Sequence, residues 1–241
     1  MTENNEVNVP VKKKSPTKKA SNTKTILLTK WAVTQITQWV KKFKKIIEHA
    51  KNKWFNESDT SNIIYDFLWE VLGYDKYTEI TTEYKIKWQY CDYGIILNWK
   101  LYMLMEVKQI WIELNDNHLF QAASYAWNEW VKWVILTNLR RWQLYCLTFW
   151  DKIEKQLVLD VDILNDTKTL VQKLQYFHRE SLQKNYLEKL FVKKMALSDK
   201  NFRKVIFSEV IIKKIQSELK NLTWVKISQD EVMNILKKYI Q

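Results

Sequence analysis

Glycine is the residue that this sequence most clearly lacks. The 241 residues include only 2 glycines, together with 13 tryptophans, whereas average usage would give about 17 glycines. Tight turns and helix ends need residues that tolerate a positive φ, and glycine serves best there. The shortage also excludes a glycine-rich phosphate-binding loop, even if every Trp is counted as Gly. We therefore expect no motor ATPase in this chain.

Cysteines and long apolar runs are also scarce. Cys91 and Cys146 make neither a disulfide framework nor zinc-ligand spacing, so we expect two reduced core thiols. No apolar stretch reaches the roughly 18 residues of a membrane span, and the polar N-terminus has no signal-peptide core. These absences predict a cytoplasmic protein that makes no use of a membrane.

Several tryptophans stand where turn chemistry favours glycine. Asn98-Trp99 separates two apolar segments, where Asn-Gly is the strong hairpin signal, and Trp130 follows an expected helix. Trp88 and Trp111 also fall in expected loops. Some bacterial lineages read the codon UGA as glycine, and a standard-code translation prints Trp there. We hypothesise that many of these residues are glycine in the cell, although Trp142 fits a strand. The alternative is a Trp-rich protein with unusual turns.

The charge is strongly positive, with a formal net charge of +12 and an isoelectric point near 9.4. Such a field favours polyanions, so DNA is the expected partner. Residues 1–28 are rich in Lys, Ser and Thr and should be disordered, either as a solvated arm or as an arm that binds phosphates. Lys41, Lys44 and Lys45 cover the polar face of the next helix. Such a face is usually only solvated, and contact with phosphates is the second interpretation.

Hydrophobic periodicity predicts an α/β protein with a central mixed sheet flanked by helices. We expect a core over 29–162 and a helical C-terminal segment over 163–241. The expected helices of the core are 29–50, 59–72 and 114–126. The expected strands are 83–87, 90–97, 100–108, 132–137 and 141–148, with a further edge strand at 155–161.

Two carboxylates and a lysine have a spacing suited to metal chemistry. Glu106 and Lys108 are two residues apart on one strand and share a face, and Asp92 lies on the strand before it. Mg²⁺ or Mn²⁺ prefers such oxygen ligands, and Val107 can add a backbone carbonyl. Lys108 would orient the attacking water or offset charge on phosphate. The simpler alternative is a salt-bridged strand surface.

The register of this hairpin decides whether the three groups meet. A two-residue turn at Asn98-Trp99 would pair Asp92 with Met105 and turn it away from Glu106. A three-residue loop with a left-handed residue at 99 would bring Asp92 to the face of Glu106. A bend or bulge elsewhere in the strand would do the same.

Further motifs extend the pattern. Gln121 and Tyr125 are four residues apart on one helical face. His118 on the same helix could approach the site, although the interpretation we favour for it is structural. Taken together, the chain resembles the PD-(D/E)XK nuclease core and its QxxxY helix, and most closely the N-terminal domain of type I restriction enzyme R subunits. The stretches that carry the resemblance are Asn56-Glu57, 67–75, Asp92-Tyr93, Glu106-Val107-Lys108, 114–116, Gln121-x-x-x-Tyr125 and 131–138.

The resemblance covers about residues 54–150 and implies a restriction-endonuclease-like fold with Mg²⁺-dependent hydrolysis of phosphodiester bonds. It implies that Asp92 and Glu106 are metal ligands and that Lys108 is the catalytic lysine. It adds Glu57 as an accessory acidic residue, and Gln121 with Tyr125 as an accessory pair. Trp99 and Trp130 stand where the family typically has glycine.

One departure from the family is large, because R subunits also carry a helicase-like motor. We therefore expect a DNA endonuclease that acts alone or with separate restriction-modification subunits. A homodimer is one of the assemblies that the sequence allows. The alternative function is a nucleic-acid-binding module on a nuclease fold that no longer cuts. RNA as the substrate is a third and weaker hypothesis.

Overall fold

The computed structural model of the chain describes residues 28–87, 89–149 and 152–240. The expected Lys-rich tail over 1–28 lies outside these ranges except for Leu28, which is buried rather than disordered. None of the described helices is long and apolar enough to cross a membrane.

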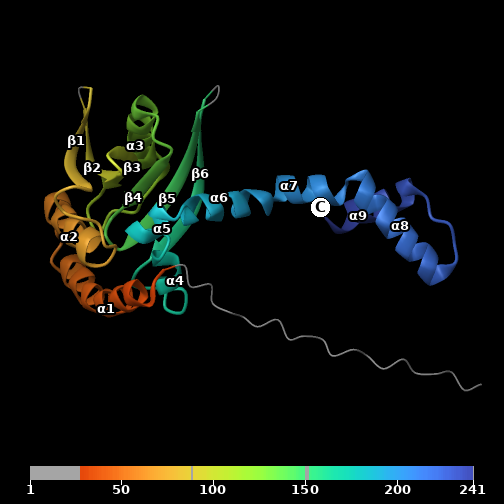
Figure 1. Cartoon of the computed structure of the whole chain (residues 1–241), viewed down its shortest axis with the longest axis horizontal. Helices are drawn as coiled ribbons and strands as arrows, with labels where there is room; N and C mark the ends of the chain where they lie inside the picture. Colours follow the sequence, from red (N-terminus) through yellow and green to blue (C-terminus); the bar gives the residue numbers. More distant parts are fainter. Residues whose placement is uncertain (1–27, 88, 150–151, 241) are drawn as a thin grey trace, which may run out of the picture.

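A six-stranded mixed sheet forms the centre of the molecule, in the order β1-β2-β3-β4-β5-β6 (Figure 1). The pair β3 and β4 is parallel, and every other neighbouring pair is antiparallel. The parallel pair requires a crossover, which α3 (Asp116–Glu129) provides. The strand bounds are β1 Ile80–Ile86, β2 Gln89–Leu97, β3 Lys100–Val107, β4 Trp133–Thr137, β5 Arg141–Phe149 and β6 Ile153–Asp162.

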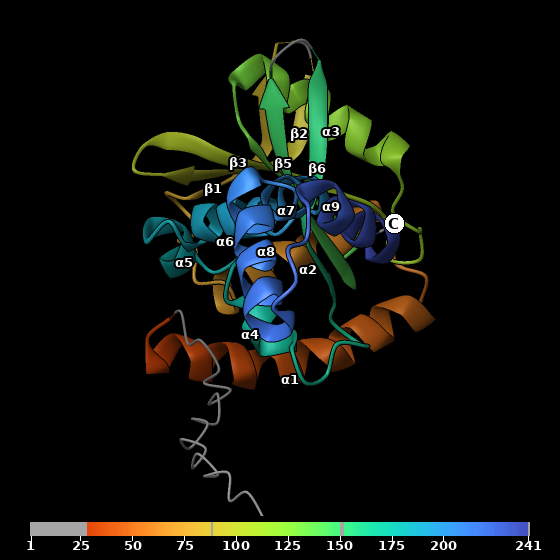
Figure 2. The same ribbon diagram turned by 90° about the vertical axis from the view of Figure 1, so that its right-hand side faces the viewer.

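Each face of the sheet is covered by helices and has its own core. One core joins the sheet to α1 (Lys30–Asn52) and α2 (Glu57–Glu70), and it includes the buried rings of Phe43, Phe67 and Trp142. A smaller core on the other face joins α3 to the sheet through alanines and leucines. Figure 2 shows α1 lying across the bottom of the molecule, beneath the sheet. The predicted mixed α/β architecture with its flanking helices is therefore confirmed.

The C-terminal helices begin in the core and end outside it. Leu174 of α4 (Leu170–Leu174), Leu182 of α5 (Arg179–Gln183) and Leu187 of α6 (Tyr186–Ala196) belong to the main core. After α6 the chain leaves the sheet as an arm (Figure 1). This arm consists of α7 (Asp199–Ile206), α8 (Glu209–Thr223) and α9 (Gln229–Tyr239).

Turn geometry agrees with the suggested glycines at Trp99 and Trp130 but not at Trp111, which has no positive φ. Asn98 and Trp99 both have positive φ, at 51° and 63°, in the turn between β2 and β3. Trp130 has φ 55° at the end of α3. Trp142, the tryptophan that fits a strand, is fully buried in β5. Trp88 lies outside the described residues, and Trp111 lies in the loop between β3 and α3.

Both cysteines are free and buried, as the sequence predicts. Cys91 donates its thiol to the carbonyl oxygen of Met105 over 3.2 Å. Burial raises the pKa of both thiols, so neither is a ready nucleophile.

Candidate metal-dependent nuclease site

A bulge in the β2–β3 hairpin brings Asp92 level with Glu106. Leu97 pairs with Lys100, so the turn has two residues, and of the alternatives left open by the sequence it is the bulge elsewhere in the strand that is present. The register then shifts, because Ile96 pairs with Leu101 and Ile95 pairs with Met103. Tyr102 is the extra, unpaired residue of this bulge. Such a bulge changes the face of the sheet toward which the following side chains point. Beyond the bulge Tyr93 pairs with Met105, and the next residue of each strand is Asp92 and Glu106.

Short hydrogen bonds join the three predicted residues. The backbone N–H of Val107 donates to Asp92 Oδ2 over 2.7 Å. Lys108 Nζ donates to Glu106 Oε1 over 2.7 Å. Glu106 is only 2% exposed, so this ion pair sits largely out of water. The sequence-predicted set of Asp92, Glu106 and Lys108 is therefore assembled at the end of β3.

The electrostatics of the cluster favour an additional positive charge. Burial is the main reason why the pKa of Glu106 is raised to about 7, and the Asp92 carboxylate adds to it. Burial also raises the pKa of Asp92, against the bond from Val107 and the charge of Lys108. Burial, the largest single effect, opposes the charged form of Lys108, but the hydrogen bond to Glu106 and the charges of Glu106, Glu57 and Asp92 together outweigh it, so the pKa of Lys108 is raised. Two poorly hydrated carboxylates with one ammonium leave negative charge that a cation would stabilise.

Oxygen atoms suited to a divalent cation remain unused in the cluster. Glu106 Oε2 is buried and has no hydrogen-bond partner among the described residues, and such an orphaned buried oxygen needs an explanation. The N–H of Val107 bonds to Asp92 Oδ2. The other carboxylate oxygen, Oδ1, is therefore a candidate metal ligand. Hard cations such as Mg²⁺ bind carboxylate oxygens and complete their shells with carbonyls and water. The residues present therefore fit Mg²⁺ or Mn²⁺.

The protein supplies few ligands. Within the described part of the chain, no group of three or more His, Cys, Asp or Glu side chains is arranged to hold a metal ion. An ion here would rest on Asp92 and Glu106. Its remaining ligands would be backbone carbonyls, such as that of Val107, and water.

Two helix N-termini border the cluster. Glu57 is the first residue of α2, after its N-cap Asn56, and its charge raises the pKa values of Asp92, Glu106 and Lys108 as a secondary contribution. The structure thus places the predicted accessory Glu57 beside the site. His118 lies in the first turn of α3, where its Nδ1 accepts a hydrogen bond from the N–H of Asn115 over 3.4 Å. Burial and then the Lys108 charge lower the pKa of His118.

The predicted pair on α3 forms, but as a bond within the helix. Gln121 Nε2 donates to Tyr125 Oη over 3.0 Å, and Tyr125 is buried. The hydrogen bonds found in the described ranges do not connect this pair to Asp92 or Glu106. Gln121 itself is exposed.

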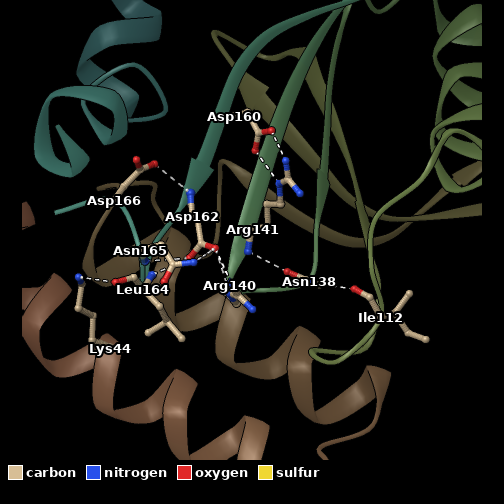
Figure 3. Close-up of polar contacts among 10 residues, drawn as sticks. All are labelled: Lys44, Ile112, Asn138, Arg140, Arg141, Asp160, Asp162, Leu164, Asn165 and Asp166. Carbon is tan, nitrogen blue, oxygen red and sulfur yellow. Dashed lines mark hydrogen bonds and ion pairs between the residues drawn. The ribbon is translucent and has the colours of Figure 1, made fainter.

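The three lysines suggested as phosphate contacts on α1 differ from one another. Lys41 and Lys45 are exposed, whereas Lys44 is partly buried. Lys44 Nζ donates to the carbonyl oxygen of Leu164 over 3.3 Å (Figure 3). Lys44 therefore ties α1 to the loop after β6.

An anchor that sequence reasoning missed holds the loop that follows Lys108. Asn138 Nδ2 donates to the carbonyl oxygen of Ile112 over 2.7 Å, and Asn138 Oδ1 accepts from the N–H of Arg141 (Figure 3). The backbone N–H of Lys108 also donates to the carbonyl oxygen of Thr137 over 2.8 Å. The Thr-Asn dipeptide at the end of β4 was the available signal, because Asn side chains commonly bond to the backbone of loops.

A paired-charge cluster supports the same corner of the sheet. Arg140 Nη2 bonds Asp162 Oδ2 over 2.7 Å, and Arg141 bonds Asp160 across β5 and β6 (Figure 3). Both arginines are thus engaged with carboxylates. We assign them a structural role.

Comparisons with protein families, curated proteins and solved structures find no match for this chain.

Proposed function

We propose that the chain is a metal-dependent endonuclease that hydrolyses DNA phosphodiester bonds. We further propose that its core is of the restriction-endonuclease-like kind and resembles the N-terminal domain of type I restriction enzyme R subunits. The observation that supports both is the bulged hairpin, in which Asp92 lies beside Glu106 and Lys108, and a buried Glu106 oxygen has no partner among the described residues.

Each residue has a defined part in this proposal. Asp92 and Glu106 would hold the cation, with Val107 fixing Asp92 through its N–H. Mg²⁺ or Mn²⁺, when bound, would offset the negative charge that develops on the phosphate. Lys108 would orient the attacking water and add a positive charge beside the phosphate. The Glu106 contact holds the Lys108 ammonium in place until substrate arrives.

DNA is the proposed substrate because the chain carries a net charge of +12, which attracts polyanions. The chain has no motif for a motor, so any ATP-driven translocation would need separate subunits. Restriction-modification proteins are therefore proposed partners. The core chemistry alone does not distinguish DNA from RNA.

Plasmid cleavage tests the proposal. Wild-type protein is incubated with supercoiled DNA and Mg²⁺ or Mn²⁺, beside Glu106→Ala, Lys108→Ala and the surface carboxylate control Asp66→Asn. We expect nicking or linearisation by the wild type and the control only. Retardation of the DNA without metal-dependent cleavage would instead support a non-cleaving binding module. A parallel digest of RNA decides the sugar preference.

A further inference from the structure

Within the described residues, four tryptophans occupy the left-handed backbone region. Trp54, Trp99, Trp130 and Trp224 have φ between 53° and 63°, close to the φ of 74° at Gly73. A bulky L-residue is strained there by roughly 1–2 kcal/mol, whereas glycine is not. The same four side chains are 71–90% exposed, so burial in a core does not explain a large ring at any of them, although Trp54 contacts Trp111 and Trp130 contacts Trp127 and Phe149 at the surface.

The local motifs at these positions are ones in which glycine is preferred. Trp54 follows the C-cap of α1, and the N–H of Phe55 bonds the carbonyl oxygen of Ala50 around it. Val131 makes the same bond to Ala126 around Trp130. These are the six-to-one bonds of the Schellman motif, whose left-handed residue is usually Gly. Trp224 ends α8 in the left-handed conformation. Trp99 is the second residue of a turn in which both φ values are positive, and Asn-Gly is preferred there.

Two other tryptophans show the opposite character. Trp133 and Trp142 are buried in strands and pack against core rings. Their indole N–H groups donate to Glu188 Oε1 over 2.9 Å and to the carbonyl oxygen of Leu139 over 2.8 Å. Glycine at either position would leave a large cavity and an unbonded acceptor.

We infer that residues 54, 99, 130 and 224 are glycine in the protein as its own cell makes it, while 133 and 142 are tryptophan. The codons test the partition directly. UGA at the four left-handed positions and UGG at the two buried positions is the expected result. UGG at the left-handed positions, or UGA at 133 or 142, would overturn it.

Stability provides an independent test of the backbone argument. Trp99 and Trp224 are each 90% exposed, and no aromatic or cation contact of either ring is found among the described residues. Trp99→Gly and Trp224→Gly should each raise Tm by about 2–4 °C. Trp31→Gly is the matched control, since Trp31 is 71% exposed but lies within α1, and there glycine should lower Tm. A loss of Tm at 99 and 224 equal to that of the control contradicts the inference.

A second inference comes from a pocket between α6, β6 and the end of α4. Its volume is about 570 Å³, within the range of small-ligand sites. Apolar side chains, two tyrosine rings and three lysines surround it, and the described part of the chain brings no acidic residue to its lining. The lining residues are Val158, Tyr176, Tyr186, Lys189, Leu190, Lys193, Lys194 and Leu197.

The polar groups of this pocket are arranged for an anion with a flat ring. Lys194 Nζ is held by the carbonyl oxygens of Leu157 and Val158, at 2.9 and 3.0 Å. Lys189 Nζ lies 5.0 Å from the centre of the Tyr186 ring. The only acidic residue of α6, Glu188, is turned to Lys132 and the Trp133 indole instead. The pocket therefore combines ring surfaces with uncompensated positive charge.

We propose that this pocket binds an unpaired nucleotide of single-stranded DNA, with the base against Tyr186 and the phosphate near Lys189 and Lys193. Aromatic platforms beside cationic side chains are how proteins hold single strands. The choice of DNA rests on the proposed nuclease function, whereas the choice of a nucleotide rests on the pocket.

Binding without metal tests the pocket separately from cleavage. Fluorescence anisotropy of a labelled thymidine oligonucleotide of about ten residues is measured in EDTA with the full chain. The double variant Lys189→Gln with Lys193→Gln should raise Kd about tenfold. The matched control is Lys213→Gln with Lys214→Gln, which removes the same charge from α8, where both lysines pair with glutamates. An equal loss in the control overturns the proposal.

The ring needs its own variants. Tyr186→Leu keeps an apolar side chain and should weaken single-strand binding about tenfold, while Tyr186→Phe keeps the ring and should bind like the wild type. No effect of Tyr186→Leu, or an equal effect on a duplex of the same length, contradicts the proposal. Because Mg²⁺-dependent cleavage is scored separately with Glu106→Ala, failure of the pocket and failure of the nuclease give different results.

Discussion

The N–H of Val107 donates to Asp92 Oδ2 over 2.7 Å, so the residue between Glu106 and Lys108 holds the carboxylate of the neighbouring strand. This bond fixes one oxygen of Asp92 beside the Glu106 side chain. It also means that Asp92 stabilises the fold as well as the site. The two roles can be separated by substitution.

Asp92→Asn and Asp92→Ala should differ in stability but not in activity. Asn retains an oxygen that can accept the bond from Val107, so its stability should stay near that of the wild type. Ala leaves the buried N–H unpaired and should cost about 1–3 kcal/mol of unfolding free energy. Both variants lack the charge needed to hold a cation, so neither should cleave DNA. Urea denaturation and plasmid nicking measure the two effects, and full activity of Asp92→Asn would remove Asp92 from the metal site.

Glu106→Gln should stabilise the metal-free protein at alkaline pH. The folded-state pKa of Glu106 is raised to about 7, above the usual 4.5, so the stability that this group contributes is present below 4.5 and is lost as pH rises through 7. The full loss is on the order of 3 kcal/mol. The Tm of the variant should exceed that of the wild type by an amount that grows between pH 5 and pH 8. Thermal melts in EDTA check this, and a constant difference across that range contradicts it.

Mg²⁺ should stabilise the wild-type protein and not the site variants. A ligand that binds only the folded state adds about 1.4 kcal/mol when its concentration is tenfold above Kd. Asp92→Asn and Glu106→Gln should lose the Mg²⁺-dependent rise in Tm. Asp66→Asn should keep it, because that carboxylate only pairs with Lys76 at the surface. An equal rise in all four proteins would mean that the cation binds elsewhere.

The strands and the first helices were predictable because their apolar residues recur with the periods of a strand or a helix. Asp92, Glu106 and Lys108 were also predictable as a set, from their spacing on consecutive strands. Their register was not, because the bulge at Tyr102 depends on how β3 pairs with both neighbouring strands. A bulge has no sequence signal as strong as the Asn98-Trp99 turn.

Other parts of the site depend on contacts between segments far apart in the sequence. Asn138 reaches Ile112 across the sheet corner, and no local pattern encodes that distance. Burial of Lys44 against Leu164 likewise follows from the path of the chain after β6. The sequence could identify both residues as polar, but only the fold shows what they bind.

Gly73→Ala should destabilise the protein for two separable reasons. Gly73 has φ 74°, and a Cβ there would lie 2.9 Å from His178 Nε2. Together these should cost about 1–3 kcal/mol. In a double-mutant cycle, His178→Ala should remove the steric part of the destabilisation caused by Gly73→Ala. The part that comes from the strained backbone should persist. Additive losses in the cycle would show that the imidazole does not press on residue 73.

Stability should fall in mild acid because of His178. This side chain is 4% exposed, its Nδ1 accepts a bond from the N–H of Glu180 over 3.1 Å, and its Nε2 has no partner in the described part of the chain. Burial lowers its pKa from 6.5 to about 4, so the folded state favours the neutral ring. The contribution is present above pH 6.5 and is lost as pH falls through 4, on the order of 3 kcal/mol in total.

The matched variant for this test is His178→Asn, because His178 is the N-cap of α5 and Asn can cap a helix without titrating. Wild-type stability should decline more steeply than that of the variant between pH 6.5 and pH 4. The comparison also isolates His178 from Glu106, whose titration acts in the opposite direction over the same range and is common to both proteins. Parallel pH profiles of unfolding free energy would show that the ring accepts a proton without loss of the fold.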